Sequence, residues 1–246
     1  MSDLSERARQ VLQEIFSGTL DLDDLVAQRH TLFPDYEDLN ALAEALTRDA
    51  QEEECQGVLR DHPRLVLGAL GHGQSDDLAF LAKPAIGSFY VADFAVLSYD
   101  QGGCKVFLIE IECASDKLFT KAGTPARGLQ QALGQVRDWD QWIRSNRRSC
   151  VQDLVRRASE LPVYPHKAAN GSFLTVSPAS FEGIWRDYDG FDCPVIEYAV
   201  LIGRWSSLTK RERERLRYLN QHDAARVWTY DQLARRAIMR PAIAPY

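Results

Sequence analysis

Several features that would assign a chemistry at once are missing from this sequence. The cysteines are scattered and include no CxxC pair, which argues against a disulfide framework or a zinc site. No run reaches the roughly 18 apolar residues of a membrane-spanning helix, and the opening MSDLSERARQ lacks the pattern of a secretory signal. We therefore expect reduced thiols, no membrane partner and a cytoplasmic location. The five cysteines are Cys55, Cys104, Cys113, Cys150 and Cys193.

Common catalytic motifs are also absent. The chain contains no GxSxG, GxxxxGK[ST], HExxH or GxGxxG. It therefore lacks the motifs that serine hydrolases, P-loop enzymes, zincins and Rossmann enzymes require. We expect no nucleotide cofactor. The net charge of -6 argues against a surface coated with positive charge for nucleic acid, but it leaves local patches open.

The chain has enough apolar sequence for a folded α/β domain. With 246 residues, 45% of them hydrophobic, it can form one large core or a core with a small helical attachment. Residues 1–62 have helical periodicity, and Pro63 should end the last helix of this segment. Beyond it the apolar pattern becomes that of strands. We predict an N-terminal helical segment over 1–62 and a domain over 63–246 with a mixed β-sheet flanked by helices.

The later elements can be placed from periodicity and caps. Apolar residues at helical spacing predict a long helix from Pro125 to about Arg144. Helices are also expected over 150–160 and after two capping boxes, and strands over 172–176, 195–203 and in the ARVWTY stretch. The two capping boxes are Thr209 with Glu212 and Thr229 with Gln232.

Three carboxylates interrupt the most apolar part of the sequence. Residues 88–98 and 105–114 read as two strands, joined by the YDQGGC turn, and they carry Asp93, Glu110 and Glu112. In an antiparallel hairpin with an even loop, all three acids face the same side of the sheet. An odd loop or a bulge would turn Asp93 away.

Such a cluster is costly without compensation. Two unit charges about 4 Å apart repel by about 4 kcal/mol at an effective dielectric of about 20. Protonation of one acid would relieve the repulsion, as would a hard divalent cation, which prefers oxygen ligands. The alternative is that one or two of these acids are ordinary edge residues in solvent.

The order D-x16-E-x-E on a hairpin, followed by a helix, resembles the restriction-endonuclease-like or PD-(D/E)xK fold. The chain more closely resembles the Shedu anti-phage nuclease family. The stretches that carry this resemblance are VLRDHPRLV at 58–66, ADFAVLS at 92–98, VFLIEIECASDKLFTKAG at 106–123, QALGQVRDWDQWI at 131–143, YAVLIGRWSSL at 198–208 and LNQHDAARVWTYDQL at 219–233.

The resemblance implies a metal-dependent DNA endonuclease that hydrolyses phosphodiesters with a magnesium-activated water, and a homo-oligomer. Asp93 and Glu110 match the family's metal-binding acids, and Glu112 stands where the catalytic lysine is usual. We assign all three to magnesium, or to manganese in its place. The alternative is a catalytically inactive Shedu-like module that binds nucleic acid or protein.

Further residues complete the predicted site. Lys121, or Lys117, is a candidate to supply the missing ammonium, and Gln135 shares a helix face with Trp139 over the site if both point to the sheet. Arg144, Arg147 and Arg148 are candidates for DNA phosphates, which suit the guanidinium fork. Glu52, Glu53 and Glu54 offer a further acid, although three successive glutamates are more typical of a solvated helix face. Gln56 and His62 also fit the resemblance, but a histidine at a helix end before proline is most often structural, and we expect neither residue to be catalytic.

Overall fold

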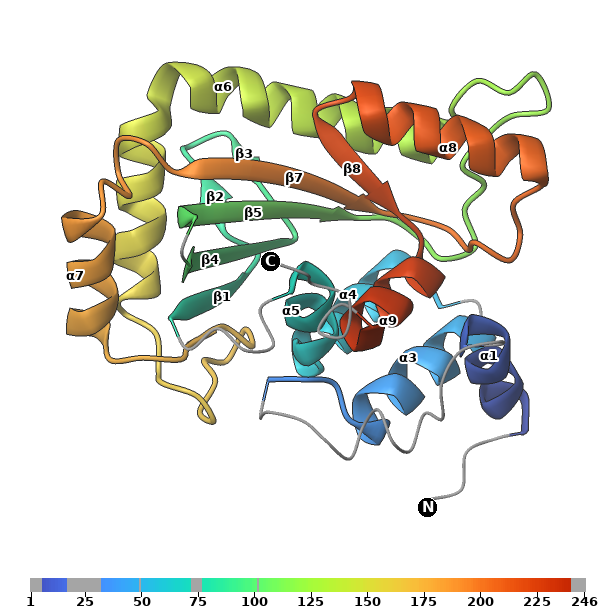
Figure 1. Cartoon of the computed structure of the whole chain (residues 1–246), viewed down its shortest axis with the longest axis horizontal. Helices are drawn as coiled ribbons and strands as arrows, with labels where there is room; N and C mark the ends of the chain where they lie inside the picture. The colour runs from blue at the N-terminus through green and yellow to red at the C-terminus, as the bar shows by residue number, and fades with distance from the viewer. Residues whose placement is uncertain (1–5, 17–31, 49, 72–76, 101, 240–246) are drawn as a thin grey trace.

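A mixed sheet of six strands lies at the centre of the protein, as Figure 1 shows for the computed structural model. The structure describes residues 6–16, 32–48, 50–71, 77–100 and 102–239. The strand order is β6-β1-β4-β5-β7-β8, and β1, β4 and β5 are antiparallel while β7 and β8 run parallel to β5. The strands are β1 (Leu78–Ala82), β4 (Phe94–Asp100), β5 (Gly103–Ile111), β6 (Phe173–Leu174), β7 (Val195–Leu201) and β8 (Ala225–Trp228). The predicted mixed α/β sheet is confirmed.

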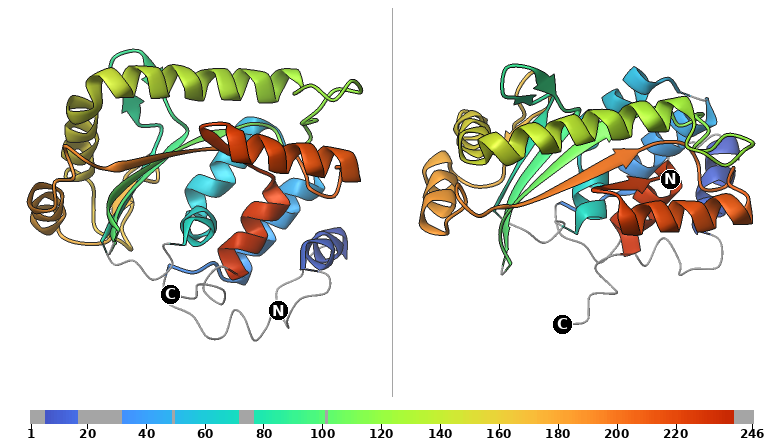
Figure 2. Two further views of the ribbon diagram at one scale, coloured as in Figure 1. Left: turned by 45° about the horizontal axis from the view of Figure 1, so that its top comes forward. Right: turned by 90° about the horizontal axis from the view of Figure 1, so that it is seen from above.

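Helices cover both faces of this sheet (Figures 1 and 2). Above it in Figure 1 lie α6 (Arg127–Ala158) and α8 (Lys210–His222), with α7 (Pro178–Asp187) at the left edge. Below it lie α1 (Glu6–Phe16), α3 (Tyr36–Thr47), α4 (Glu52–Asp61), α5 (Arg64–Leu70) and α9 (Tyr230–Met239). Each face has its own apolar core, because side chains of successive strand residues point to opposite faces.

The N-terminal and C-terminal helices belong to one layer. Helices α5 and α9 pack together, and residues of α1, α3, α5 and α9 share a core with one face of the sheet. Gly68 of α5 permits this approach, since a Cβ there would lie 2.7 Å from the carbonyl oxygen of Ala237 in α9. The predicted division at residues 62 and 63 therefore crosses a continuous layer of packed helices, and it remains a prediction.

Local sequence signals mark several helix ends. Asp35 caps α3 in a reciprocal box with Asp38, and α4 ends at Asp61, two residues before Pro63. The box of Thr209 and Glu212 starts α8, and Thr229 and Gln232 exchange hydrogen bonds in front of α9.

Some elements differ from the prediction. The helix expected throughout 1–62 is interrupted between α3 and α4. The helices expected to be separate on either side of residues 144–150 form the single helix α6, which is kinked at Asn146 (φ −130°). Strand β1 and helix α7 were not predicted. A short hairpin of β2 (Ala85–Ile86) and β3 (Tyr90–Val91) also lies outside the main sheet.

The thiols and the helix lengths agree with the composition. All five cysteines are free. Within the described ranges no helix combines the length and the apolar character that crossing a bilayer requires.

Candidate functional site

Asp93 and Glu110 lie at the end of the β4–β5 hairpin. The ladder pairs Asp100 with Gly103 across a two-residue loop and ends at Phe94 opposite Ile109, so Asp93 and Glu110 directly follow its last pair. The loop is even, as the predicted shared face requires. However, the backbone nitrogen of Asp93 donates to the carbonyl oxygen of Ile109 at 3.1 Å, and Ile109 already lies opposite Phe94, so the regular register does not continue to Asp93 and the hydrogen bond has the pattern of a β-bulge.

Glu110 and Glu112 lie on the α6 side of the sheet. Leu108, two residues before Glu110, belongs to the core under α6, and side chains two apart on a strand share a face. Asp93 lies beside them, where its Oδ2 accepts a hydrogen bond from the backbone nitrogen of Ile111 at 2.6 Å.

Asp93 and Glu110 are buried and Glu112 is half-buried, and burial raises the pKa of both glutamates. Asp93 is 5% exposed and Glu110 8%. Burial raises the pKa of Glu110 to about 8, and the charges of Asp93 and Glu112 add to the rise. Burial likewise raises the pKa of Glu112 to about 7, with further contributions from Glu52 and Asp116. We refer to Asp93, Glu110 and Glu112 together as the acid pocket. The raised pKa values of its two glutamates indicate that it has too little positive charge to balance the carboxylates.

Glu52 brings a fourth carboxylate to this pocket from the start of α4. Burial raises the pKa of Glu52, and the charge of Asp93 adds to it while Lys83 lowers it. Gln56 donates from its Nε2 to Glu52 Oε1 at 2.9 Å, which orients the carboxylate. Of the three successive glutamates, Glu54 instead caps its helix by accepting from the Gln51 nitrogen. The sequence favoured a solvated face for the whole run, and all three glutamates are exposed, although Glu52 still acts electrostatically on the other acids.

Lys83 supplies the ammonium group that position 112 lacks. It follows β1, and its Nζ forms an ion pair with Asp93 Oδ1, while its backbone nitrogen donates to the Asp93 carbonyl oxygen at 2.8 Å. Its backbone is left-handed (φ 51°), which is uncommon for a residue with a side chain. Sequence reasoning missed Lys83 because it missed β1, and the apolar run LAFLA before it was the available signal.

The two lysines predicted for this role lie elsewhere. Lys121 is exposed in a loop that Thr120 and Thr124 close by hydrogen bonds. Lys117 is exposed and acts electrostatically on Glu212 of α8. In the described part of the chain, neither lysine contributes to the pKa shifts of Glu110 or Glu112, whereas Lys83 lowers that of Glu110.

Helix α6 begins beside the acids. A Cβ at Gly128 would lie 2.8 Å from Asp116 Oδ2 and 3.6 Å from Glu112 Oε2, so glycine allows the helix terminus to approach the carboxylates closely. The positive end of the helix dipole favours negative charge at this position. Gln135, farther along α6, is exposed whereas Trp139 is 1% exposed, so the two do not share the buried face that the sequence suggested.

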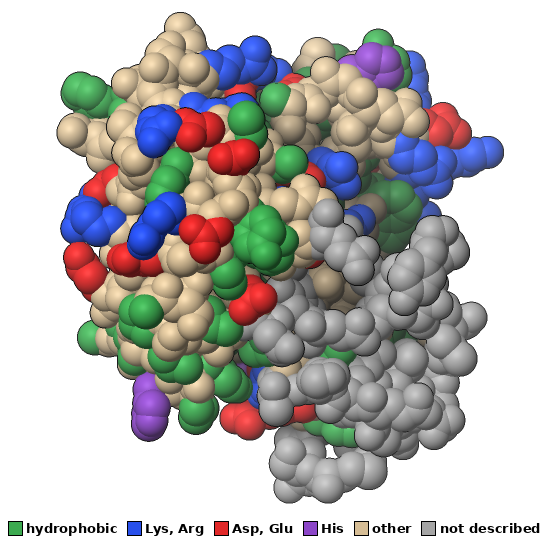
Figure 3. All heavy atoms as spheres, turned by 60° about the vertical axis from the view of Figure 1, so that its left-hand side comes forward, with side chains coloured by type: hydrophobic (Ala, Val, Ile, Leu, Met, Phe, Trp, Pro, Cys, Tyr) green, Lys and Arg blue, Asp and Glu red, His purple; other side chains and the backbone are tan. Residues whose placement is uncertain are grey.

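The predicted DNA arginines lie at the other end of this straight part of α6. At about 1.5 Å per residue, Arg144 is about 24 Å along the helix from Gly128. Arg144 pairs with Asp140 at 2.8 Å, Arg148 pairs with Asp192, and Arg147 is exposed. On the face shown in Figure 3, Lys and Arg side chains are interspersed with Asp and Glu. The fold therefore does not bring these arginines to the acid pocket.

The donor set of the pocket fits a magnesium ion. It consists of carboxylates whose raised pKa values reflect too little compensating charge, and a hard divalent cation would provide that charge. Among the residues described, no three Asp, Glu, His or Cys side chains are already gathered as ligands of one metal. Magnesium commonly takes one or two protein carboxylates and keeps several waters, so the two carboxylates of Asp93 and Glu110 suffice.

Comparison with known families gives two matches. The family model described as Shedu protein SduA, C-terminal, matches residues 49–234, which is about three quarters of the chain and includes every residue of the acid pocket. A model described as OHCU decarboxylase matches residues 3–77, under a third of the chain. No curated protein matches the sequence.

Proposed function

The chain belongs to the Shedu SduA C-terminal family, and on this basis we propose that it is a metal-dependent DNA endonuclease of anti-phage defence. The family is associated with defence, and the acid pocket is the feature of this chain that supports a nuclease. The observation that carries the proposal is the cluster of Asp93, Glu110 and Glu112, in which the charges of Asp93 and Glu112 act on Glu110 and Lys83 pairs with Asp93. The proposal includes the restriction-endonuclease-like fold.

In the proposed site Asp93 and Glu110 hold magnesium, or manganese in its place, and Glu112, which the sequence also assigned to the ion, stands beside them. When bound, the ion supplies a Lewis acid that offsets the charge developing on a phosphodiester. The rigid placement of Asp93 comes from the protein itself, since the Ile111 nitrogen holds one carboxylate oxygen and Lys83 the other. Glu110 is fixed through its strand, β5, where it lies in register with Val200 of β7.

Other proteins of this fold use one lysine at position 112 of the present numbering. Here two residues share its functions: one accepts a proton, and the other supplies positive charge. Glu112 has a pKa raised to about 7, so at neutral pH it can accept a proton from an attacking water. The Lys83 ammonium is 54% exposed at its side chain and remains within reach of an incoming phosphate while paired with Asp93. We therefore assign Glu112 as general base and Lys83 as the cation that orients the phosphate.

A cleavage assay tests this function. The full chain is incubated with linear duplex, supercoiled circular and single-stranded DNA, in magnesium, in manganese and in EDTA. We expect metal-dependent cleavage of at least one form and its loss in Asp93→Asn and Glu110→Ala. Glu182→Gln, an exposed acid of α7, is the control that retains cleavage. Equal cleavage by Glu110→Ala and the unmodified protein would refute the assignment.

The second candidate is a non-catalytic Shedu-like module that binds nucleic acid or a partner protein. The glutamate at position 112, in place of the usual lysine, is the observation that favours it. Calorimetric titration of magnesium and manganese into the unmodified protein and Glu110→Ala separates the two functions. Heat that disappears in Glu110→Ala supports the enzyme, and no metal-dependent heat in either protein supports the module.

The remaining parts of the proposal rest on the family. They are DNA as the partner, a homo-oligomer and a cytoplasmic location. Light scattering of the purified full chain measures the oligomeric state directly, and a monomer at micromolar concentration would contradict that part.

A further inference from the structure

Two large apolar side chains, Phe89 and Val91, are exposed on the short hairpin of β2 and β3. Phe89 is 79% exposed and Val91 is 53% exposed. Among the residues that the structure describes, Phe89 is the most exposed of the large hydrophobic side chains. The hairpin lies outside the main sheet, and Figure 2 (right) shows it projecting beside α6. An aromatic ring in this position is available to a ligand.

The pairing within the hairpin turns these side chains away from the core. Ile86 and Tyr90 are opposed in the ladder, and both pack with the core beneath α6. Ala92 belongs to the same core. Because successive side chains of a strand point to opposite faces, Val91 lies on the outer face of the hairpin. Phe89 extends into solvent from the loop that joins the two strands.

The tip of the hairpin is fixed against α6. Gly87 has a positive φ (62°), and a Cβ there would lie 2.3 Å from a ring carbon of Trp142 in α6. Trp142 is itself partly buried on the core beneath α6. Phe89 follows Gly87 by two residues, so a supported turn presents its ring. A ligand that binds this ring has little backbone to order, which favours binding.

The base of the hairpin lies at the acid pocket. The Lys83 nitrogen donates to the Asp93 carbonyl oxygen at 2.8 Å, and the Ala92 nitrogen donates to that of Pro84 at 3.1 Å. Four residues of extended chain separate Phe89 from Asp93, a span of at most about 13 Å at about 3.3 Å per residue. Nucleotides in a stacked strand rise by about 3.4 Å each. The Phe89 ring can therefore meet a base within about four nucleotides of a phosphate in the acid pocket.

The apolar surface of the hairpin fits a single base better than a protein partner. A stable protein interface buries about 800 Å² on each partner, which two side chains cannot supply. A base needs only one ring face, and proteins that hold single strands stack bases on aromatic side chains. In a duplex every base is already stacked on its neighbours, so an unpaired strand is the form that uses Phe89. The other exposed large hydrophobic residues of the described chain lie in other segments, at Tyr36, Val163, Tyr188, Val195 and Tyr218.

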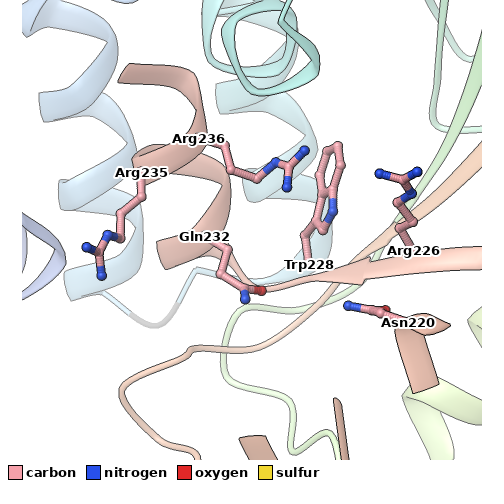
Figure 4. Close-up of a pocket in the computed structure, with 6 residues that line it drawn as sticks. All are labelled: Asn220, Arg226, Trp228, Gln232, Arg235 and Arg236. Carbon is pink, nitrogen blue, oxygen red and sulfur yellow. The ribbon is translucent and has the colours of Figure 1, made fainter. Parts of the chain in front are cut away.

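The arginines of β8 and α9 do not converge on a comparable site for DNA. In Figure 4, Arg226 and Arg236 lie on either side of the Trp228 ring, and Arg235 extends away from it. The three guanidinium groups therefore do not face one point. The cation at the base of the β2–β3 hairpin is Lys83, whose side chain is 54% exposed.

We propose that Phe89 stacks on a base of an unpaired DNA strand whose phosphate lies at the acid pocket. The proposal rests on the proposed function, because it takes DNA as the substrate. It adds the form of DNA that the protein prefers and the residue that selects it. Phe89 positions the strand and takes no part in the reaction at the phosphate.

Fluorescence anisotropy in low salt tests the proposal without relying on cleavage. It is measured in EDTA and again in calcium, a hard cation that also takes carboxylate ligands. The probes are a short oligothymidylate, a strand of the same length made of abasic nucleotides, and a blunt duplex of that length. The abasic strand keeps the phosphates but has no base to stack.

The unmodified protein should bind the oligothymidylate more tightly than the abasic strand. We expect Phe89→Ser to bind the oligothymidylate about tenfold more weakly, equivalent to about 1.4 kcal/mol. Its affinity for the abasic strand and the duplex should not change. Phe89→Trp keeps an aromatic face and should bind the oligothymidylate as the unmodified protein does.

Tyr188→Ser is the matched control. It removes a ring that is 56% exposed at the end of α7, and it should bind every probe as the unmodified protein does. Equal affinities of Phe89→Ser and the unmodified protein for the oligothymidylate would overturn the proposal, as would equal weakening on the abasic strand. A change in oligomeric state of Phe89→Ser, with oligothymidylate binding unchanged, would instead assign Phe89 to a contact between copies of the chain.

Failure of the stacking can be told apart from failure of the proposed function. Metal-dependent cleavage by the unmodified protein, together with unchanged oligothymidylate binding by Phe89→Ser, would overturn the stacking alone. No binding of any probe and no cleavage of any DNA form would overturn both.

Discussion

Lys83 and Asp93 close the base of the β2–β3 hairpin by two contacts at once. The backbone nitrogen of Lys83 donates to the Asp93 carbonyl oxygen at 2.8 Å, and the Lys83 ammonium pairs with Asp93 Oδ1. The left-handed backbone of Lys83 (φ 51°) accompanies this closure. Lys83 and Asp93, the cation and one acid of the pocket, are therefore joined along the chain by this short hairpin alone.

Replacing Lys83 should remove cleavage while leaving the fold intact. In Lys83→Met the cation beside the phosphate is lost, and we expect cleavage to fall by about 10²–10³, as when one stabilising donor is removed from an active site. Lys121→Met, at an exposed loop lysine, is the control with unchanged cleavage. Initial rates on the DNA form that the unmodified protein cleaves measure both, and equal rates would show that Lys83 has no catalytic role.

The backbone of Lys83 makes a separate stability prediction. A left-handed residue with a Cβ costs about 1–2 kcal/mol that glycine avoids. Both Lys83→Gly and Lys83→Met lose the ion pair, so we expect Lys83→Gly to be the more stable of the two by about 1 kcal/mol. Urea unfolding followed by circular dichroism measures the difference. A more stable Lys83→Met would contradict the backbone argument.

Glu110 should make stability fall as the pH rises in the absence of metal. Its folded pKa of about 8 lies above the ordinary value of 4.5, so the folded state keeps a proton that the unfolded state releases. No cost arises below about pH 4.5, and the full cost is present above about pH 8. Glu110→Gln should therefore gain stability over the unmodified protein between pH 5 and pH 8, on the order of 3 kcal/mol.

Denaturant unfolding in EDTA at several pH values measures this gain. Glu182→Gln serves as the exposed control and should follow the unmodified protein at every pH. A constant difference between Glu110→Gln and the unmodified protein from pH 5 to pH 8 would mean that the pKa of Glu110 is not raised.

Magnesium should stabilise the folded protein through the acid pocket. A ligand present at about 100 times its dissociation constant contributes about 2.7 kcal/mol, and each kcal/mol shifts Tm by about 2–4 °C in a chain of this size. We expect the shift in the unmodified protein at pH 8 and not in Asp93→Asn. Differential scanning fluorimetry with magnesium and with EDTA measures it, and an equal shift in both proteins would place the ion elsewhere.

Gly68 should be essential for the packing of α5 on α9. Gly68→Ala places a Cβ 2.7 Å from the Ala237 carbonyl oxygen and 3.1 Å from its Cα, so backbone must move, and we expect a loss of about 1–3 kcal/mol. Gly183→Ala in α7 meets nothing within 4 Å and should instead gain about 0.5–1 kcal/mol from helix propensity. Thermal unfolding of the pair checks both signs, and a neutral Gly68→Ala would contradict the close helix contact.

The hairpin was predictable because it is local. β4 and β5 are joined by one two-residue turn, so strand periodicity and turn residues place Asp93 and Glu110 at the same end of the hairpin. The caps of α3 and α8 were predictable for the same reason, since each depends on residues three positions apart. The irregular hydrogen bond of Asp93 at the end of the hairpin was not predictable from the parity of the loop.

The sequence by itself determined the α/β class, the family and the carboxylates of one hairpin. Tertiary structure alone decided which cation and which fourth acid meet them, because Lys83 arrives from β1 and Glu52 from α4. It also decided that three arginines of β8 and α9 surround a cavity while those at 144–148 lie far from the acids. Contacts between distant segments depend on strand order and helix packing. The periodicity of the sequence does not indicate either of them.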